Sequence, residues 1–227
     1  MNIDVITMEE LIWAIRELKR NKVHGPDGVP VECYKDMQED QLKCILNLFN
    51  HWWEGNAIES EATRAQVILI YKKGDKNNLA NYRPISLLNT NYKLYIAILQ
   101  KRLADVLDPH LQNTQYGFRA NRGTINALHY IRRIVEKSEK TEAKTLLVLL
   151  DLEKAFDQVI HTKLIDALKR MNVPGKMTSA IQELYRQPTF RASMENVDGD
   201  WTKQETGIRQ GCPRSPYLIL IFMSRLF

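Results

Sequence analysis

An aspartate that directly follows a short apolar run is the residue best placed for chemistry in this sequence. Leu146–Leu150 are apolar residues bounded by polar ones, the pattern of a strand buried on both faces, and Asp151 comes next. Desolvating a carboxylate at the end of a buried strand is costly unless a cation or several donors face it. Asp151 is therefore either a ligand for a hard divalent cation or a structural carboxylate that caps a helix or pairs with a lysine.

Basic side chains concentrate in the middle third of the chain. Residues 64–133 carry 12 basic and 3 acidic side chains, whereas residues 1–63 carry 6 and 12, and residues 134–227 carry 14 and 12. The cations are interleaved with aromatic residues such as Tyr71, Tyr82 and Phe118, a mixture that binds phosphate by charge and bases by stacking. Solvated helix faces have a similar composition, so nucleic-acid binding and simple solvation both fit these residues.

The composition indicates a globular protein with one large or two small lobes. The 227 residues are 44% hydrophobic and 26% charged, which excludes low-complexity chains and argues against disorder. Cys33, Cys44 and Cys212 lie far apart and form no metal-binding pair, so an intracellular, reducing compartment, nucleus or cytoplasm, fits best. The polar, acidic N-terminal stretch and the short apolar runs predict neither secretion nor a membrane span.

Hydrophobic periodicity predicts a mixture of helices and strands around these residues. Thr7 and Glu10 have capping-box spacing ahead of a helix, and residues 66–71 resemble a strand that returns through 83–88 as a hairpin with a basic tip. The other expected elements are helices at 40–53, 92–106, 161–171 and 176–187, a helix that opens at Thr124, a hairpin of 189–197 and 201–206 around Asp198-Gly199-Asp200, and an apolar helix or strand at 217–227.

Several segments, taken in chain order, resemble the motif series of reverse transcriptases, specifically those of non-LTR (LINE-like) retrotransposons. They are Ala65–Lys73, Asn81–Leu88, Gln115–Arg119, Leu149–Asp157 and Gly207–Pro213, and Asn21–Pro30 resembles the segment that precedes the fingers in the same elements. The resemblance implies an α+β, right-hand polymerase fold. An N-terminal extension and the fingers would span residues 1–145, and a partial palm would span 146–227.

The resemblance also implies a reaction, RNA-directed DNA synthesis from dNTPs on an RNA template and a DNA primer, with Mg²⁺ as the metal. Asp151 matches the first catalytic aspartate, which binds both metal ions of a two-metal phosphoryl transfer. Phe156 matches the aromatic residue under the incoming sugar. Arg83 and one of Lys72 and Lys73 match the cations that grip the triphosphate, and the sequence does not decide between the two lysines.

The remaining matched residues belong to the template and primer side of the site. Gln210 and Gly211 match the loop beside the nascent base pair, where a glycine permits close backbone approach. Arg119 and Arg122 match positions near the template backbone, although a solvated basic helix start explains them equally well. Arg214 departs from the family, which usually has leucine there, so this residue either reaches phosphate or solvent or is a damaging change.

One expected catalytic motif is absent from the sequence. In this family a Tyr-x-Asp-Asp turn follows the Gly207–Pro213 motif, but no two aspartates are adjacent anywhere in these 227 residues. A lone Asp151 cannot hold two Mg²⁺ ions, so we expect no polymerase activity from the isolated chain. Because the Asp-Asp hairpin that would complete the palm sheet is missing, we also expect an uncovered apolar helix at 217–227. The alternatives to a polymerase fragment are a non-catalytic nucleic-acid-binding remnant and a gene-model fragment without a function of its own.

Overall fold

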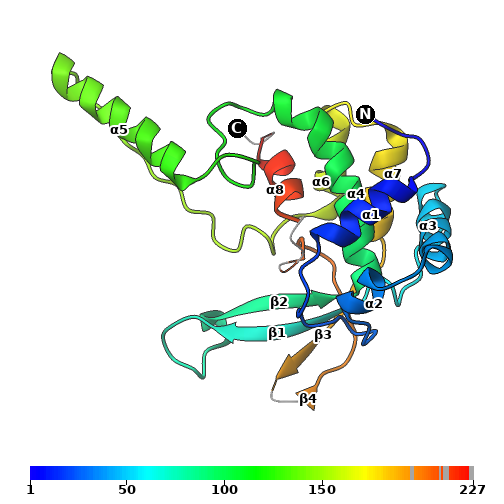
Figure 1. The fold of residues 1–227 in the computed structure, drawn as a ribbon. Helices are drawn as coiled ribbons and strands as arrows, with labels where there is room; N and C mark the ends of the chain where they lie inside the picture. Colours follow the sequence, from blue (N-terminus) through cyan, green and yellow to red (C-terminus); the bar gives the residue numbers. More distant parts are fainter. Residues whose placement is uncertain (195–196, 210, 212–214, 225–227) are drawn as a thin grey trace.

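The computed structural model describes residues 1–194, 197–209, 211 and 215–224. Figure 1 shows a helical body from which a β-hairpin and one long helix project. The elements in chain order are α1 (Met8–Glu17), α2 (Val31–Lys35), α3 (Glu39–Trp53), β1 (Ala65–Tyr71), η1 (Leu79–Asn81), β2 (Tyr82–Leu88), α4 (Thr90–Leu107), η2 (Asp108–His110), α5 (Thr124–Thr141), α6 (His161–Arg170), α7 (Gly175–Leu184), β3 (Thr189–Met194), β4 (Val197–Asp198), β5 (Thr202–Lys203) and α8 (Ser215–Met223).

The described strands form a sheet with the order β2-β1-β3-β4, which joins strands that are distant in the sequence, and β5 pairs with β3 beside β4. The predicted hairpin is confirmed, since β1 and β2 pair antiparallel from Ala65 opposite Leu88 to Tyr71 opposite Tyr82. β3 then pairs parallel with β1, with Phe190 opposite Ala65. The sheet therefore includes strands from both sides of the expected boundary at residue 145.

Helix α4 is the centre of the hydrophobic core. Its residues Leu94, Tyr95 and Ile98 are fully buried, and α1 packs on α4 while α6 packs on α7 and α8. An aromatic cluster joins α3 to α4, because the rings of Phe49, Trp52 and Tyr95 have centroids 5.2 to 5.5 Å apart. The sheet extends from this core.

The N-terminal segment is attached to α4 by an ion pair between a buried arginine and a partly buried glutamate. The predicted capping box of α1 is present, with Thr7 and Glu10 bonded reciprocally. The same Glu10 carboxylate accepts two hydrogen bonds from Arg102, at 2.7 and 2.6 Å, and the Arg102 side chain is only 3% exposed. Arg102 also donates to the carbonyl oxygens of Asp4 and Val5, so one guanidinium satisfies three separate acceptor groups.

Asn89, at the end of the motif Asn81-Tyr-Arg-Pro-Ile-Ser-Leu-Leu88, links three loops. Its Oδ1 accepts a hydrogen bond from the Asp27 backbone N–H at 3.2 Å, and its Nδ2 donates to the Glu61 carbonyl at 2.8 Å. Asn89 is 4% exposed, so its side-chain amide is shielded from water and is satisfied by these two hydrogen bonds. The segment 21–30, which resembles the family in sequence, is thereby fixed against the base of the hairpin.

The prediction of a buried strand at Leu146–Leu150 is wrong. These residues form neither helix nor strand and are between 58% and 88% exposed. A strand needs a neighbour for its backbone groups and cover for both faces, and no described segment pairs with this run. Asp151 consequently follows an exposed segment rather than the end of a buried strand.

Three other expectations need adjustment. α5 begins at Thr124 as predicted, but it projects from the body in Figure 1 and none of its residues is buried. The second hairpin forms, but Met194 pairs with Val197 and Ser193 with Asp198, so Asp198 is a paired strand residue rather than part of the expected Asp198-Gly199-Asp200 turn. The apolar segment after residue 215 is a helix, α8, whose described residues 217–221 are buried rather than uncovered, because α8 packs on α6.

Among the described helices, we find none that has both the length and the apolar character needed to cross a bilayer.

Candidate functional site

The predicted phosphate-binding cations lie at the projecting end of the β1–β2 hairpin. Lys72, Lys73 and Arg83 are all exposed. The Lys72 N–H donates to the Asn81 carbonyl at 2.8 Å, which continues the ladder beyond β1, and Ile70 pairs with Arg83. Side chains alternate along a strand and paired residues share a face, so Lys72 lies on the same face as Arg83.

The loop that begins at Gly207 is attached to the segment that follows Asp151. The Gly207 N–H donates to the Val159 carbonyl at 2.8 Å, and the Ile208 N–H donates to the Phe156 carbonyl at 2.7 Å. Gly207 has a φ of +87°, and a Cβ at this position would lie 3.0 Å from the Asp157 backbone. A glycine is therefore required where the two motifs meet.

The other end of the same loop lies against the hairpin. Gly211 has a φ of +110°, and a Cβ there would lie 2.6 Å from the Ser86 carbonyl oxygen and 3.2 Å from the Ile85 side chain. The loop thus contacts β2 at one end and the residues after Asp151 at the other. A cleft of about 610 Å³ lies beside it, lined among others by Val67, Pro84, Ser86, Asp157, Thr206 and Arg209.

Arg209, which sequence reasoning did not single out, holds this loop in place. It is 2% exposed, its guanidinium lies over the Tyr92 ring at 5.3 Å, and it donates to Gln204 and to the Thr189 carbonyl at 3.3 and 3.4 Å. The side chain therefore connects the loop to α4 and β3. Its position within the recognised motif was the only sequence signal for this role.

An aromatic contact brings a fourth motif to the site. The rings of Phe118 and Phe156 meet edge to face with their centroids 6.3 Å apart. Phe118 belongs to the Gln115–Arg119 motif and Phe156 to the Leu149–Asp157 motif. Segments that are about forty residues apart in the chain are thus in contact.

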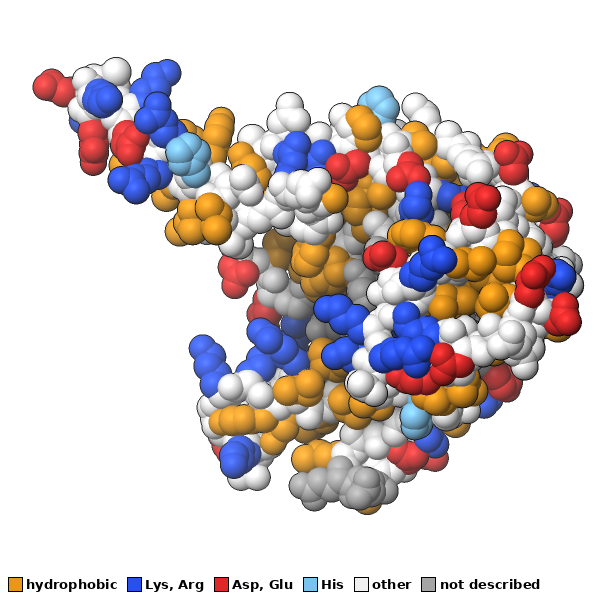
Figure 2. All heavy atoms as spheres, viewed as in Figure 1, with side chains coloured by type: hydrophobic (Ala, Val, Ile, Leu, Met, Phe, Trp, Pro, Cys, Tyr) orange, Lys and Arg blue, Asp and Glu red, His pale blue; other side chains and the backbone are white. Residues whose placement is uncertain are grey.

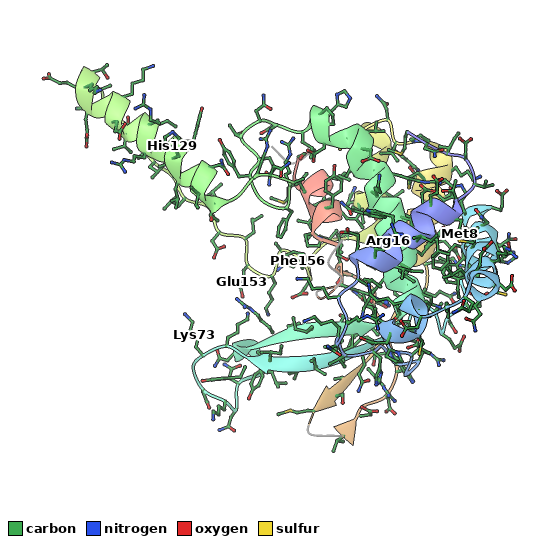
Figure 3. The ribbon with its side chains drawn as sticks, viewed as in Figure 1. Met8, Arg16, Lys73, His129, Glu153 and Phe156 are labelled. Carbon is green, nitrogen blue, oxygen red and sulfur yellow. The ribbon has the colours of Figure 1, made fainter. Side chains whose placement is uncertain are left out.

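The segment of Glu153 and Phe156, which follows Asp151 in the chain, faces the hairpin across an opening. Figure 2 shows an open notch between the hairpin and the segment after α5, with Lys and Arg side chains gathered on the hairpin side. In Figure 3, Lys73 marks the hairpin end of this notch, and Glu153 and Phe156 mark the segment that carries Asp151. Asp151 itself is exposed, and no hydrogen bond or ion pair from it to another described residue is present. Its carboxylate is open to a ligand.

The described residues do not form a complete site for Mg²⁺. Nowhere among them do three His, Cys, Asp or Glu side chains converge as metal ligands would. Asp151 supplies one exposed carboxylate, which is a suitable hard ligand but leaves most of an octahedral coordination shell to other groups. Of the ligands that a Mg²⁺ site needs, the described residues therefore supply the Asp151 carboxylate alone.

The two arginines matched to the template side are engaged within the protein. The Arg119 side chain is 5% exposed and bonds the Asp108 carboxylate at 3.1 Å, the Asp108 carbonyl at 2.7 Å and the Gln112 carbonyl at 2.9 Å. Arg122 is half-buried and donates to the Asn113 and Gln115 carbonyls. Neither guanidinium has the free, exposed geometry that a phosphate contact would favour, and both fix the loop that carries Phe118.

The Asp108–Arg119 pair lies beside α8. Burial raises the pKa of the Tyr217 phenol, and the neighbouring Asp108 charge raises it further. Since Tyr217 is on α8, this helix, the loop of Gln115–Arg119 and the end of α4 share one packed region. The predicted base-pair contact of Gln210 and the departure at Arg214 lie outside the described residues.

Comparison with known proteins agrees with this combination of motifs. Residues 70–227, more than half of the chain, match the family model described as reverse transcriptase (RNA-dependent DNA polymerase). The chain belongs to this family. The resemblance to non-LTR retrotransposon reverse transcriptases that the sequence indicated is confirmed.

Curated relatives cover nearly all of the chain. It is 29% identical over 219 residues to the transposon TX1 uncharacterized 149 kDa protein of Xenopus laevis, which covers 94% of this chain and 16% of that protein. It is 27% identical over 194 residues to the Pol polyprotein of the type-1 retrotransposable element R2 of Nasonia vitripennis, covering 86% and 18%. It is 24% identical over 225 residues to the RNA-directed DNA polymerase from mobile element jockey of Drosophila melanogaster, covering 98% and 24%. The chain thus spans a quarter or less of the length of these relatives.

Proposed function

We propose that this chain is the fingers and partial palm of an RNA-directed DNA polymerase and that it binds a dNTP, an RNA template and a DNA primer inside the cell, in the nucleus or cytoplasm. The fingers would end near residue 145 and the palm would begin at 146. The observation that carries the proposal is the loop 207–211, which contacts β2 through Gly211 and the segment after Asp151 through Gly207. Motifs that the chemistry must bring together meet at this loop.

The proposed roles are those that the resemblance implies, and the exposure and position of several side chains support them. Lys72 and Arg83 are exposed on one face of a projecting hairpin, where a flexible cation and a planar guanidinium can reach triphosphate oxygens. Lys73 follows at the turn and adds positive charge for phosphate. Phe156, which contacts Phe118, would lie under the incoming sugar, and Gln210 and Gly211 would lie beside the nascent base pair.

Asp151 is the proposed metal ligand and the catalytic carboxylate of this chain. Mg²⁺, when bound, would activate the primer hydroxyl and neutralise the triphosphate. Because the described residues provide one such carboxylate, we expect binding without nucleotide transfer from the isolated chain. Arg119 and Arg122 would act by fixing the loop around Phe118 rather than by holding the template themselves.

Template-directed dNTP binding tests this proposal without requiring catalysis. The affinity for a fluorescent RNA–DNA primer-template would be measured by anisotropy, with and without the dNTP that is complementary to the next template base. We expect the complementary dNTP to tighten the complex more than a mismatched dNTP does. Equal effects of the two nucleotides would contradict the proposed site.

A matched pair of variants locates the site on the chain. Lys72→Ala/Lys73→Ala/Arg83→Ala removes three exposed cations from the hairpin, and Lys163→Ala/Lys169→Ala/Arg170→Ala removes the same charge from the exposed side of α6. The hairpin variant should lose the dNTP effect, because the three cations proposed to hold the triphosphate are gone. The α6 variant should bind as the unaltered chain does.

The basic and exposed hairpin also supports a second candidate, a non-catalytic nucleic-acid-binding remnant. In this case the salt-dependent affinity would survive Asp151→Ala and no dNTP would change it. The same assay therefore separates the two candidates. A chain that neither binds nucleic acid nor unfolds cooperatively would instead support a gene-model fragment.

A further inference from the structure

The carbonyl oxygen of Gly207 accepts hydrogen bonds from two side chains that lie outside the recognised motifs. His161 Nε2 lies 2.9 Å from this oxygen, and Gln204 Nε2 lies 3.0 Å from it. Because a carbonyl oxygen can only accept hydrogen bonds, His161 must carry a proton on Nε2. Gly207 is buried, so the two donors replace the water that an exposed carbonyl would bind.

The two donors belong to different parts of the fold. His161 is the first residue of α6, and its ring packs against the ring of Tyr185, the residue after α7, with centroids 4.9 Å apart. Gln204 follows β5, and its backbone N–H donates to the Pro188 carbonyl at 2.8 Å, next to the start of β3. Gly207 is therefore tied to the helices through one donor and to the sheet through the other.

The orientation of the Gln204 amide is set by the buried Arg209. Gln204 Oε1 accepts a hydrogen bond from Arg209 Nε at 3.3 Å, and Gln204 Nε2 donates to the Thr206 carbonyl at 3.1 Å as well as to Gly207. A guanidinium has no acceptor, so a flipped amide would lose all three hydrogen bonds. The amide oxygen thus faces a cation that is 2% exposed, and the amide nitrogen faces two carbonyl oxygens.

Gly207 controls the loop 207–211 because it is the residue at which the loop begins. Its N–H is held by the Val159 carbonyl at 2.8 Å, and its own carbonyl is held by the two side chains. Three residues further along the loop comes Gly211, whose backbone lies against β2 at Ser86. A rotation of the Gly207 peptide would therefore displace the part of the loop that contacts β2, since each peptide unit between them is planar.

We infer that His161 and Gln204 are positioning residues: by donating to one carbonyl oxygen, they set where the loop 207–211 lies against β2. Both act through the loop and neither touches the nucleotide. The inference rests on the proposed function, because it assigns to the position of this loop the selection of the dNTP that is complementary to the template base.

Two substitutions remove the donors and keep the other contact of each side chain. Gln204→Glu has the same shape and still accepts from Arg209, but its carboxylate cannot donate to Gly207. His161→Phe keeps an aromatic ring against Tyr185 and removes the Nε2 donor. His161→Gln does the opposite, because it keeps a donor nitrogen and removes the ring.

Hydrogen exchange at the amides of Gly207 and Ile208 in the free chain measures the positioning. Gln204→Glu and His161→Phe should each accelerate this exchange by about two- to tenfold, the loss expected for one hydrogen bond. The double variant leaves a buried carbonyl without a donor, so its exchange should be faster than the product of the two single effects. A double variant at or below that product would overturn the inference.

Two comparisons keep this measurement specific. Gln187→Glu/His129→Phe makes the same two changes at exposed positions and should exchange as the unaltered chain does. His161→Gln should exchange more slowly than His161→Phe, which decides the role of the donor even if the double variant does not fold. The reverse order would show that the ring against Tyr185, and not the donor, holds the loop.

The anisotropy assay with an RNA–DNA primer-template shows whether the position of the loop selects the nucleotide. Its readout is the ratio of the affinities measured with the complementary and with a mismatched dNTP. Gln204→Glu/His161→Phe should lower this ratio toward one and leave the affinity without dNTP unchanged, whereas His161→Gln should keep the ratio. A ratio that the double variant leaves unchanged would overturn the inference. A ratio of one in the unaltered chain would instead refute the proposed function, and the selection assigned to the loop with it, while exchange still reports on the two donors.

Discussion

Replacing Gly211 by alanine should detach the loop 207–211 from the hairpin. A residue with a side chain at a positive φ costs about 1–2 kcal/mol, and φ at Gly211 is +110°. The new Cβ would also lie 2.6 Å from the Ser86 carbonyl oxygen, a backbone atom that cannot rotate away. Overpacking of this kind typically adds about 1–3 kcal/mol. The sum is about 2–5 kcal/mol, unless the loop moves away from β2.

Thermal unfolding and hydrogen exchange together measure both ways of relieving this strain. We expect Gly211→Ala either to lower Tm by at least about 5 °C or to increase exchange along residues 82–88 as the loop separates from β2. Gly199→Ala is the control, because its Cβ would be 3.5 Å from the nearest atom and its φ is not positive. If Gly211→Ala left both Tm and exchange unchanged, the contact between the loop and the hairpin would not exist as described.

Further predictions concern the contacts that support the site. Arg102→Met should lower the free energy of unfolding in urea by about 3–5 kcal/mol, because it leaves the partly buried Glu10 carboxylate without its cation. Lys101→Met is the control: it breaks the exposed pair with Asp105 and should cost about 0–1 kcal/mol. Similar losses in the two variants would refute the distinction between the two ion pairs. Burial raises the pKa of Glu10, but its hydrogen bonds from Arg102 and the Thr7 N–H outweigh this and hold the pKa below the ordinary value of 4.5. The stabilisation from Glu10 should therefore be fully present above pH 4.5 and should be lost as the pH falls through the lowered pKa of Glu10. In Glu10→Gln, the urea midpoint should change less with pH over this acidic range. Asn89→Ala should cost about 2–4 kcal/mol by removing its bonds to the Asp27 N–H and the Glu61 carbonyl, and a loss below about 1 kcal/mol would show that water replaces them.

Local patterns in the sequence were sufficient for the elements that depend on their own residues. The capping box of Thr7 and Glu10 fixes the start of α1, and the β-branched run 66–71 followed by a basic turn predicts the β1–β2 hairpin. These features involve residues that are close in the chain. For the same reason, the α-helices α3, α4, α6 and α7 were placed within a few residues of their actual bounds.

Features that depend on distant partners could not be predicted in this way. Leu146–Leu150 have the composition of a buried strand, but the segment is exposed. A strand forms only where another strand is available to pair with it, and the local composition does not show whether one is. The parallel pairing of β3 with β1 joins residues more than a hundred positions apart. The inward-facing Arg119 and the buried Arg209 carry the same charge as any surface arginine, and only the fold distinguishes them.

The candidate site was predicted better as a set of motifs than as a set of side-chain roles. The order of the motifs identified the family, and the structure brings the hairpin, the Phe156 segment and the loop of Gly207 into contact. The roles assigned to Lys72, Lys73, Arg83, Asp151 and Phe156 are proposals that rest on the family resemblance, with exposure and position as support.

Hydrogen-exchange footprinting of the chain with an RNA–DNA primer-template and the complementary dNTP tests the central claim most directly. If one site is built from these motifs, protection should appear together in residues 66–88, 156–159 and 207–209, and Lys72→Ala/Lys73→Ala/Arg83→Ala should remove it from all three segments. Protection confined to α5, or protection of the hairpin without the other two segments, would contradict the claim that the motifs form a single nucleotide site.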